Sequence, residues 1–322
     1  MTDVVTGERA TAEAGERHID LSILTVTFNS DDALLCRSLE TAVRSARAAG
    51  LVSEVVVVDN GSDRFPVVPP LGLPTLVMRS EANVGFGSAV NMGVRGSRGD
   101  FVYCINPDTA TSEKALRLLM DRAIRPGRRL VAGFLMVNGA PQVDASLLWL
   151  FSTERLLHRS AHRRMLSTCL ERPFIRVRKV CGGAFLARRA ELLMLGPFDE
   201  DFFLYSEDSD LSIRAALAGF ALELIPAAEI SHVGAASVKE HGRLVERARV
   251  DGSLRLVAKH RASLRFVATV ELWLITVLGL VAPRLTSSGS QATRRARFAE
   301  LRRWSRRAVP DRLDPISAVA DR

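Results

Sequence analysis

Residues 23–60 read ILTVTFNSDDALLCRSLETAVRSARAAGLVSEVVVVDN, and this stretch decides the fold class. It opens with an apolar, β-branched run at 23–28. It closes with a continuous apolar run at 54–60, which is typical of a strand buried on both faces of a parallel sheet. Between them, apolar residues recur at helical spacing until Gly50. The order strand, helix, strand predicts a βαβ unit.

The same alternation continues along the first half of the chain. Apolar runs at 74–80 and 100–106 predict two further strands, a Gly-rich turn enters a helix over 83–96, and helical spacing predicts a helix over 112–125. Strands that alternate with helices form an open, mostly parallel α/β sheet, and ligands bind such sheets beyond the carboxyl ends of the strands. We therefore expect an α/β fold with its site along that rim.

After Val137 the alternation becomes less regular. Gly182 and Gly183 allow close backbone approach, and Ser206 and Gly219 are expected as the N-cap and the stop of one helix. The elements expected are, in order, a basic and partly amphipathic insert at 141–178, a strand at 179–189, the helix between Ser206 and Gly219, a strand at 221–232, and three helices that end in an Arg-rich run.

The charge of the chain is unevenly distributed. The formal net charge is +8, but the basic excess lies in 151–179, 239–265 and 284–312, so the remainder is acidic. Basic surfaces of this kind meet nucleic acid or anionic lipid. None of the four cysteines forms a C-x-x-C pair, and Cys104 and Cys181 lie in apolar runs, so these two are expected as buried thiols in a reducing compartment. Residues 1–20 lack the apolar region of a signal peptide and are expected as a disordered lead-in.

Residues 266–282 raise the question of a membrane. This apolar segment is shorter than the roughly 20 residues that a spanning helix needs, it contains Glu271, and arginines flank it. We interpret it as an interfacial or docking helix and not as a span. The competing interpretations are a helix buried against its own domain and a helix that builds a homo-oligomer.

Three predicted strands end in polar, turn-forming residues. These are Phe28-Asn29, Asp59-Asn60-Gly61 and Asn106-Pro107-Asp108. Such residues also form ordinary turns, but three sets on one rim indicate a site. A carboxylate at Asp108 is able to hold a divalent cation that neutralises a diphosphate. A dinucleotide motif fails in NVGFGSAVNMG (83–93), because Val90 stands where G-x-G-x-x-G needs glycine.

Six carboxylates crowd into FDEDFFLYSEDSDLSIR (198–214), although like charges repel. A helix that begins near Glu207 and Asp208 favours the ionised form of a carboxylate in its first turn. Asp210 and Arg214 stand four residues apart and are expected to pair. The cluster is expected to meet either positive charge or a proton, as a general base does. The alternative is a solvated acidic turn.

Seven motifs occur in a recognisable order, namely VTFNS, VVVVDNGSD, NVGFGSAVNMG, INPDT, CGGAFLARR, FDEDFFLYSEDSDLSIRAALAGF and ISHVGAAS. In this order the chain resembles family-2 glycosyltransferases, and most of all the rhamnosyltransferase branch, which acts on cell-surface polysaccharides and lipid-linked glycans. The resemblance implies a GT-A fold over about 21–238 with a basic insert at 147–179. The basic helical region at 239–322 follows it. The resemblance also implies a nucleotide-sugar donor, Mg²⁺ or Mn²⁺, and inversion at the anomeric carbon.

The resemblance also implies roles for individual residues. Asp108 would bind the metal, Asn106 stands where the D-x-D motif has its first Asp, and His232 falls where some relatives place a further metal ligand. The second residue of the family's Glu-Asp pair is the general base, which is Asp208 here, and Glu207 would orient or tune it. The residues implied for the donor pocket are Phe28 and Asn29 against the nucleobase, Asp59 and Asn60 at its polar edge, and Asn83, Gly87, Asn91, Asn106 and Asp108.

We therefore expect an inverting, metal-dependent glycosyltransferase. The expected donor is dTDP-L-rhamnose, with a UDP-sugar (galactofuranose or hexosamine) as the alternative, and the acceptor is a polyprenyl-diphosphate-linked or growing cell-surface glycan. The basic C-terminal region would place the enzyme in the cytoplasm, peripherally on the anionic inner face of the cell membrane. An alternative of another class is a non-catalytic basic protein that binds nucleic acid. The intact Asp108, Asp208 and His232 argue against it, so no nucleic acid partner is expected.

Overall fold

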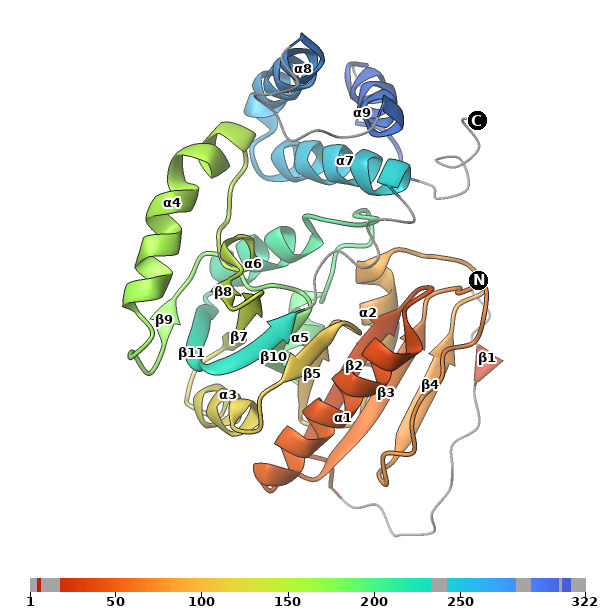
Figure 1. Cartoon of the computed structure of the whole chain (residues 1–322), viewed down its shortest axis with the longest axis vertical. Helices are drawn as coiled ribbons and strands as arrows, with labels where there is room; N and C mark the ends of the chain where they lie inside the picture. Colours follow the sequence, from red (N-terminus) through yellow and green to blue (C-terminus); the bar gives the residue numbers. More distant parts are fainter. Residues whose placement is uncertain (1–4, 7–17, 233–241, 282–290, 307–308, 314–322) are drawn as a thin grey trace.

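The structure is a computed structural model that describes residues 5–6, 18–232, 242–281, 291–306 and 309–313. A mixed α/β body holds the central sheet, and a group of helices from the C-terminal region lies beyond one end of that body (Figure 1). Both the α/β class and the helical C-terminal region are confirmed.

One sheet of 11 strands runs through the described residues. β2 (Leu21–Thr27) pairs in parallel with β3 (Ser53–Asp59) and β5 (Phe101–Ile105), and β3 pairs in parallel with β4 (Thr75–Arg79). β10 (Ala184–Arg188) enters antiparallel between β5 and β7, and β7 pairs in parallel with β11. The remaining strands are β1 (Val5–Thr6), β6 (Thr109–Thr111), β7 (Arg129–Val137), β8 (Ala140–Pro141), β9 (Ile175–Arg176) and β11 (Ala221–His232).

The valine run of β3 shows why this sheet is covered on both faces. Val56 and Val58 point into one hydrophobic core, while Val55 and Val57 point into the other, because successive side chains of a strand leave on opposite faces. All four side chains are fully buried. The continuous apolar run therefore marks a strand between two layers of helices, as predicted.

Helices cover the two faces of the sheet. Residues of α1 and α3 fill the core on one face, and residues of α2, α5 and α6 fill the core on the other. Their bounds are α1 (Asp32–Ala48), α2 (Phe86–Gly96), α3 (Ala115–Ala123), α5 (Arg189–Leu195) and α6 (Glu207–Leu217). Short 3₁₀ turns lie at Val143–Ala145 and Ala262–Leu264.

Three helices of the C-terminal region share a core of their own, which contains Leu254 of α7 and Leu301 and Trp304 of α9. These helices are α7 (Gly242–His260), α8 (Arg265–Val281) and α9 (Gln291–Trp304). The Trp304 Nε1–H donates to Asp251 Oδ1 at 3.0 Å, and Arg247 Nε lies 3.1 Å from Glu300 Oε2. α9 is therefore packed into the C-terminal region.

Glu271 connects α8 to the start of α4 (Ser152–Thr168). Its carboxylate accepts hydrogen bonds from the backbone N–H groups of Ser152 and Thr153, at 3.1 and 2.8 Å, where α4 begins. It thus supplies acceptors and negative charge to a helix N-terminus. One side of α8 packs on α7 and α9, as expected of a helix buried against its own domain, while the other side exposes apolar residues. Among the described helices, none is long and apolar enough to cross a bilayer.

Several expectations need correction. The strand expected at 179–189 begins only at Ala184, and β7 was not predicted. Ser206 does precede α6, but it has a φ of +67° and its side chain makes no capping hydrogen bond. Of the expected lead-in at 1–20, residues 1–4 and 7–17 lie outside the described residues, and Val5–Thr6 pairs with β4.

Candidate active site

The ends of β2 and β3 form a tightly hydrogen-bonded rim. Asn29, at φ +48°, exchanges hydrogen bonds with Asp63: its Oδ1 accepts from the Asp63 N–H at 2.9 Å and its Nδ2 donates to Asp63 Oδ2 at 3.1 Å. Asp59 is fully buried, accepts from the Ser62 N–H at 3.1 Å and lies 3.4 Å from Arg79 Nε. In this structure both side chains shape the rim, and the half-buried Phe28 follows directly on β2.

Several residues that were expected to line the pocket of the nucleotide-sugar donor join three segments of the chain. Asn60 Nδ2 donates to Asn83 Oδ1 at 3.0 Å, and Asn60 Oδ1 accepts from the Val84 N–H at 2.9 Å, so the end of β3 holds the turn before α2. Asn91 is buried, and its amide pairs with both backbone groups of Phe198 at 2.8 and 2.9 Å. A Cβ on Gly87 would lie 2.9 Å from Phe198 Cβ. Gly87 and Asn91 therefore hold α2 against the start of the acidic segment 198–214. The sequence did not predict this contact.

Asp108 and His232 lie side by side, although they are far apart in the sequence. β11 pairs antiparallel with β6, with His232 opposite Thr109, and this register brings His232 Nε2 to 3.1 Å from Asp108 Oδ2. Gln142 Oε1 lies 2.9 Å from His232 Nδ1. If Nδ1 carries the ring proton and donates to Gln142, Nε2 keeps a free lone pair on the side of Asp108.

Asp108 and His232 supply part of the ligand shell that a divalent cation needs. One carboxylate and one imidazole are two ligands, and no group of three or more His, Cys, Asp or Glu side chains able to hold a metal occurs among the described residues. A cation such as Mg²⁺ is commonly held by one or two protein groups, with phosphate oxygens and water completing its shell. Asp108 and His232 would therefore hold a metal together with a diphosphate.

The first turn of α6 carries the expected general base. Asp208 Oδ2 lies 3.1 Å from Lys179 Nζ, in a largely buried pair. Burial opposes the charge on Lys179, but Asp208, Cys181 and Glu207 together outweigh it, so the pKa of the Lys179 ammonium is raised. Lys179 is a residue that the sequence analysis missed, because a single lysine ahead of CGG carries no recognisable signal.

The environment of Glu207 favours the neutral form of its carboxyl group. Burial, followed by the nearby charge of Asp208, raises the pKa of Glu207 to about 8. Its Oε2 is buried and meets no hydrogen-bond partner among the described residues. Near neutral pH the pair therefore consists of a protonated Glu207 and an Asp208 in contact with a lysine. A buried carboxyl group with a raised pKa next to a second carboxylate is typical of acid–base sites.

Two glycines connect the turn before Asp108 with helix α6. A Cβ on Gly183 would lie 2.2 Å from Asn106 Oδ1, so the Asn106 side chain occupies the space that any other residue would fill. A Cβ on Gly182 would lie 3.6 Å from Asp208 Cβ. Consecutive residues thus touch the turn that leads to Asp108 and the helix that carries Asp208, which connects the two groups of expected site residues.

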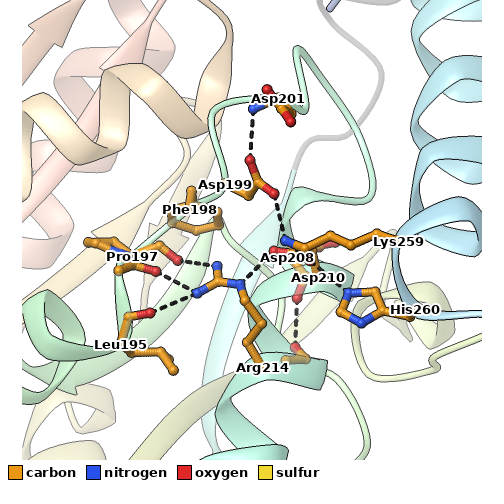
Figure 2. A network of polar contacts seen from close by, with 12 residues as sticks. Leu195, Pro197, Phe198, Asp199, Asp201, Asp208, Asp210, Arg214, Lys259 and His260 are labelled. Atoms are coloured by element: carbon orange, nitrogen blue, oxygen red, sulfur yellow. Dashed lines mark hydrogen bonds and ion pairs between the residues drawn. The ribbon is translucent and has the colours of Figure 1, made fainter. Parts of the chain in front are cut away.

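The carboxylates of Asp199 and Asp210 meet cations and a backbone group, as Figure 2 shows. The predicted pair is confirmed, because Arg214 Nε donates to Asp210 Oδ2 at 2.7 Å. Asp199 Oδ1 accepts from the Asp201 N–H at 2.9 Å, and Glu200 Oε1 accepts from Asn91 at 2.9 Å. Asp210 and Asp199 also meet Lys259, which was not predicted.

Comparison with known proteins agrees with this geometry. The model of the family described as Glycosyl transferase family 2 matches residues 22–190. A curated relative, N-acetylglucosaminyl-diphospho-decaprenol L-rhamnosyltransferase of Mycobacterium tuberculosis, is 30% identical over 244 residues, which cover 66% of this chain and 74% of the relative. An N-acetylglucosaminyltransferase of Bradyrhizobium diazoefficiens is 28% identical, over 64% of this chain and 43% of the relative.

Two solved structures share the fold. The mannosyltransferase PcManGT from Pyrobaculum calidifontis, in complex with GDP-Man and Mn²⁺, aligns over 93% of this chain and 90% of its own, with a TM-score of 0.57 and 14% identity. GalNAc-T7 with UDP, GalNAc and Mn²⁺ aligns over 74% of this chain with a TM-score of 0.52 and 17% identity, and the aligned part spans half of that protein. The chain belongs to glycosyl transferase family 2 and is a glycosyltransferase that resembles the rhamnosyltransferases of that family.

Proposed function

We propose that this glycosyltransferase moves L-rhamnose from dTDP-L-rhamnose to a polyprenyl-diphosphate-linked or growing surface glycan, with inversion at the anomeric carbon. The observation that carries the proposal is the contact of Gly182 with Asp208 and of Gly183 with Asn106, which unites a proton acceptor with the Asp108–His232 pair. The choice of rhamnose and of a lipid-linked acceptor is supported by the name of the relative that is 30% identical.

In the proposed reaction an acceptor hydroxyl attacks the anomeric carbon from the face opposite the diphosphate. The new C–O bond forms while the bond to the diphosphate breaks, the electron pair leaves with the diphosphate, and the hydroxyl proton passes to the Asp208 carboxylate. Lys179 holds that carboxylate in place at 3.1 Å. Protonated Glu207 adds no second negative charge beside it. A bound Mg²⁺ or Mn²⁺ would neutralise charge on the departing diphosphate.

A UDP-sugar, with galactofuranose or a hexosamine, is the alternative donor. A panel of nucleotide sugars, measured by thermal shift with Mg²⁺ or Mn²⁺, separates the two, since a ligand that binds the folded state raises its stability by mass action. dTDP-L-rhamnose is expected to give the largest shift. A larger shift with a UDP-sugar would replace the proposed donor. Membership of an enzyme family speaks against the non-catalytic, nucleic-acid-binding alternative.

We further propose that the enzyme binds peripherally to the anionic inner face of the cell membrane. The side of α8 away from α7 and α9 presents one apolar stripe, in which Phe266 is 78% exposed and Leu274 is 58% exposed. The neighbouring helix α4 exposes Leu156 and Leu157 on a helix rich in arginine. Apolar burial and attraction between arginines and anionic headgroups act together in such binding. This surface would hold the enzyme at a lipid-linked acceptor.

A further inference from the structure

Asp210 is a fully buried carboxylate that the proposed reaction does not use. It lies in the first turn of α6, two residues after Asp208, and none of its surface is exposed. A buried carboxylate is costly unless cations and hydrogen-bond donors surround it. Its partners should therefore explain why the helix of the general base carries this charge in its interior.

The partners of Asp210 come from two helices (Figure 2). Arg214, one turn further along α6, donates from Nε to Asp210 Oδ2 at 2.7 Å. Lys259 Nζ and His260 Nε2 each lie 2.7 Å from Asp210 Oδ1. Lys259 and His260 are the last two residues of α7. The C-terminal end of α7 is thus bound to the first turn of the helix that carries the base.

The same cations hold the segment that leads into α6. Lys259 Nζ also lies 2.5 Å from Asp199 Oδ2. The Arg214 guanidinium donates to the backbone carbonyls of Leu195, Gly196 and Pro197 at 3.0, 2.6 and 2.7 Å. Four hydrogen-bond acceptors of this segment are therefore fixed by the two cations that also pair with Asp210.

A second contact of α7 lies on the other side of the base. Tyr205 and Ser206, directly before α6, have φ values of +68° and +67°, which are unfavourable for residues with a Cβ and persist only where the surroundings enforce them. Gly252 of α7 packs on this turn so closely that a Cβ there would lie 2.4 Å from the Tyr205 carbonyl oxygen. α7 therefore contacts the chain at residues 205 and 210, and Glu207 and Asp208 lie between these contacts.

We infer that α7 is a positioning element for the general base, in which Lys259 and His260 act through Asp210 and Gly252 acts through Tyr205. The inference rests on the proposed role of Asp208. It makes the C-terminal helical region part of the catalytic unit as well as a surface for the membrane. The competing explanation is that the cluster only stabilises the fold.

A double-mutant cycle between Lys259→Met and Asp208→Asn distinguishes the two, with the donor and acceptor proposed above. Lys259→Met alone is expected to lower kcat about 10-fold or more, because small displacements of a reacting group are costly, and to leave the KM for the donor unchanged. In the Asp208→Asn background, Lys259→Met should lower kcat hardly any further, since the effects of residues that act as a unit are not additive. Asp210→Asn and His260→Gln should follow the same pattern.

Arg297→Gln is the matched control, because Arg297 ties α9 to Glu246 of α7 at 2.5 Å without touching Asp210. It should lower Tm about as much as Lys259→Met but leave kcat unchanged. An equal fold-loss from Lys259→Met in both backgrounds, or the same kcat in Lys259→Met and Arg297→Gln, overturns the inference while the proposed function stands. If Asp208→Asn keeps the wild-type kcat, the proposed base is wrong and the inference falls with it.

Discussion

Lys179 and Asp208 form a largely buried ion pair, with 3.1 Å between Nζ and Oδ2, at the first turn of α6. The pair joins the segment before Gly182 and Gly183 to the helix that carries the proposed base. Since Lys179 also donates to the Asp144 carbonyl at 3.3 Å, it fixes the carboxylate relative to the start of the insert. Lys179 thus supplies one of the positive charges that meet the acidic segment 198–214, beside Arg214 and Lys259 at Asp210.

Lys179→Met should lower kcat about 10-fold or more at pH 7, because the Asp208 carboxylate loses the cation that holds it in place and small displacements of a reacting group are costly. The KM for the donor should stay unchanged. Initial rates at varied donor concentration measure both constants, with Arg178→Met, at the neighbouring position, as control. A kcat equal to that of Arg178→Met would contradict this account of Lys179.

Glu207 should make the stability of the protein depend on pH. Its pKa is raised to about 8 in the folded protein from an ordinary value of 4.5, so folding favours the protonated form. The stabilisation is complete below about pH 4.5 and is lost as the pH rises toward 8. Glu207→Gln removes this titration, so its Tm should fall less than that of the wild type between pH 5 and pH 8.5. Parallel Tm curves for the two proteins would show that Glu207 is already ionised at low pH.

The Asp108–His232 pair should control binding of the donor with metal. Asp108→Ala is expected to abolish the thermal shift that Mn²⁺ adds in the presence of donor, while the Tm without ligands stays near that of the wild type. Gln142→Leu should lower the affinity for the metal about 10- to 100-fold, because His232 loses the partner that orients its ring. Asp201→Ala, at an exposed carboxylate, is the control. Full transfer activity of the wild type in EDTA would refute a metal role for this pair.

The apolar stripe of α8 should determine binding to anionic vesicles. The double variant Phe266→Ser with Leu274→Ser should float less with such vesicles than the wild type, and high salt should weaken the binding of both proteins. Met194→Ser, at an exposed apolar position on α5, is the control. Truncation before α9 is a poor test, because Leu301 and Trp304 belong to the core of the C-terminal region. Flotation of the double variant equal to that of the control would exclude this stripe as the membrane contact.

The sequence predicts best those features that depend on neighbours along the chain. The valines of β3 identify a strand covered on both faces, and the spacing of Asp210 and Arg214 predicts their pair. β7 escaped prediction, although residues 129–137 form a similar apolar run. It lies between the helix expected at 112–125 and the insert, a stretch for which no element was predicted.

Contacts between distant segments follow from strand register and helix packing, which no local pattern contains. His232 meets Asp108 only because β11 pairs with β6 in one register. Lys179 reaches Asp208 from another segment, and Lys259 and His260 reach Asp210 from a helix outside the expected catalytic domain. The resemblance to a family named the expected ligands and the base, but the cations around them could be found only in three dimensions.

A comparison of Asp208→Asn with Glu207→Gln at pH 7 tests most directly whether Asp208 is the general base. Both substitutions are nearly isosteric, and Glu207 is protonated at this pH, so only Asp208→Asn removes a proton acceptor. Transfer kcat should fall by roughly 10²–10⁴ in Asp208→Asn, with donor binding by thermal shift retained, and should change little in Glu207→Gln. An active Asp208→Asn beside an inactive Glu207→Gln would contradict the account and assign the base to Glu207.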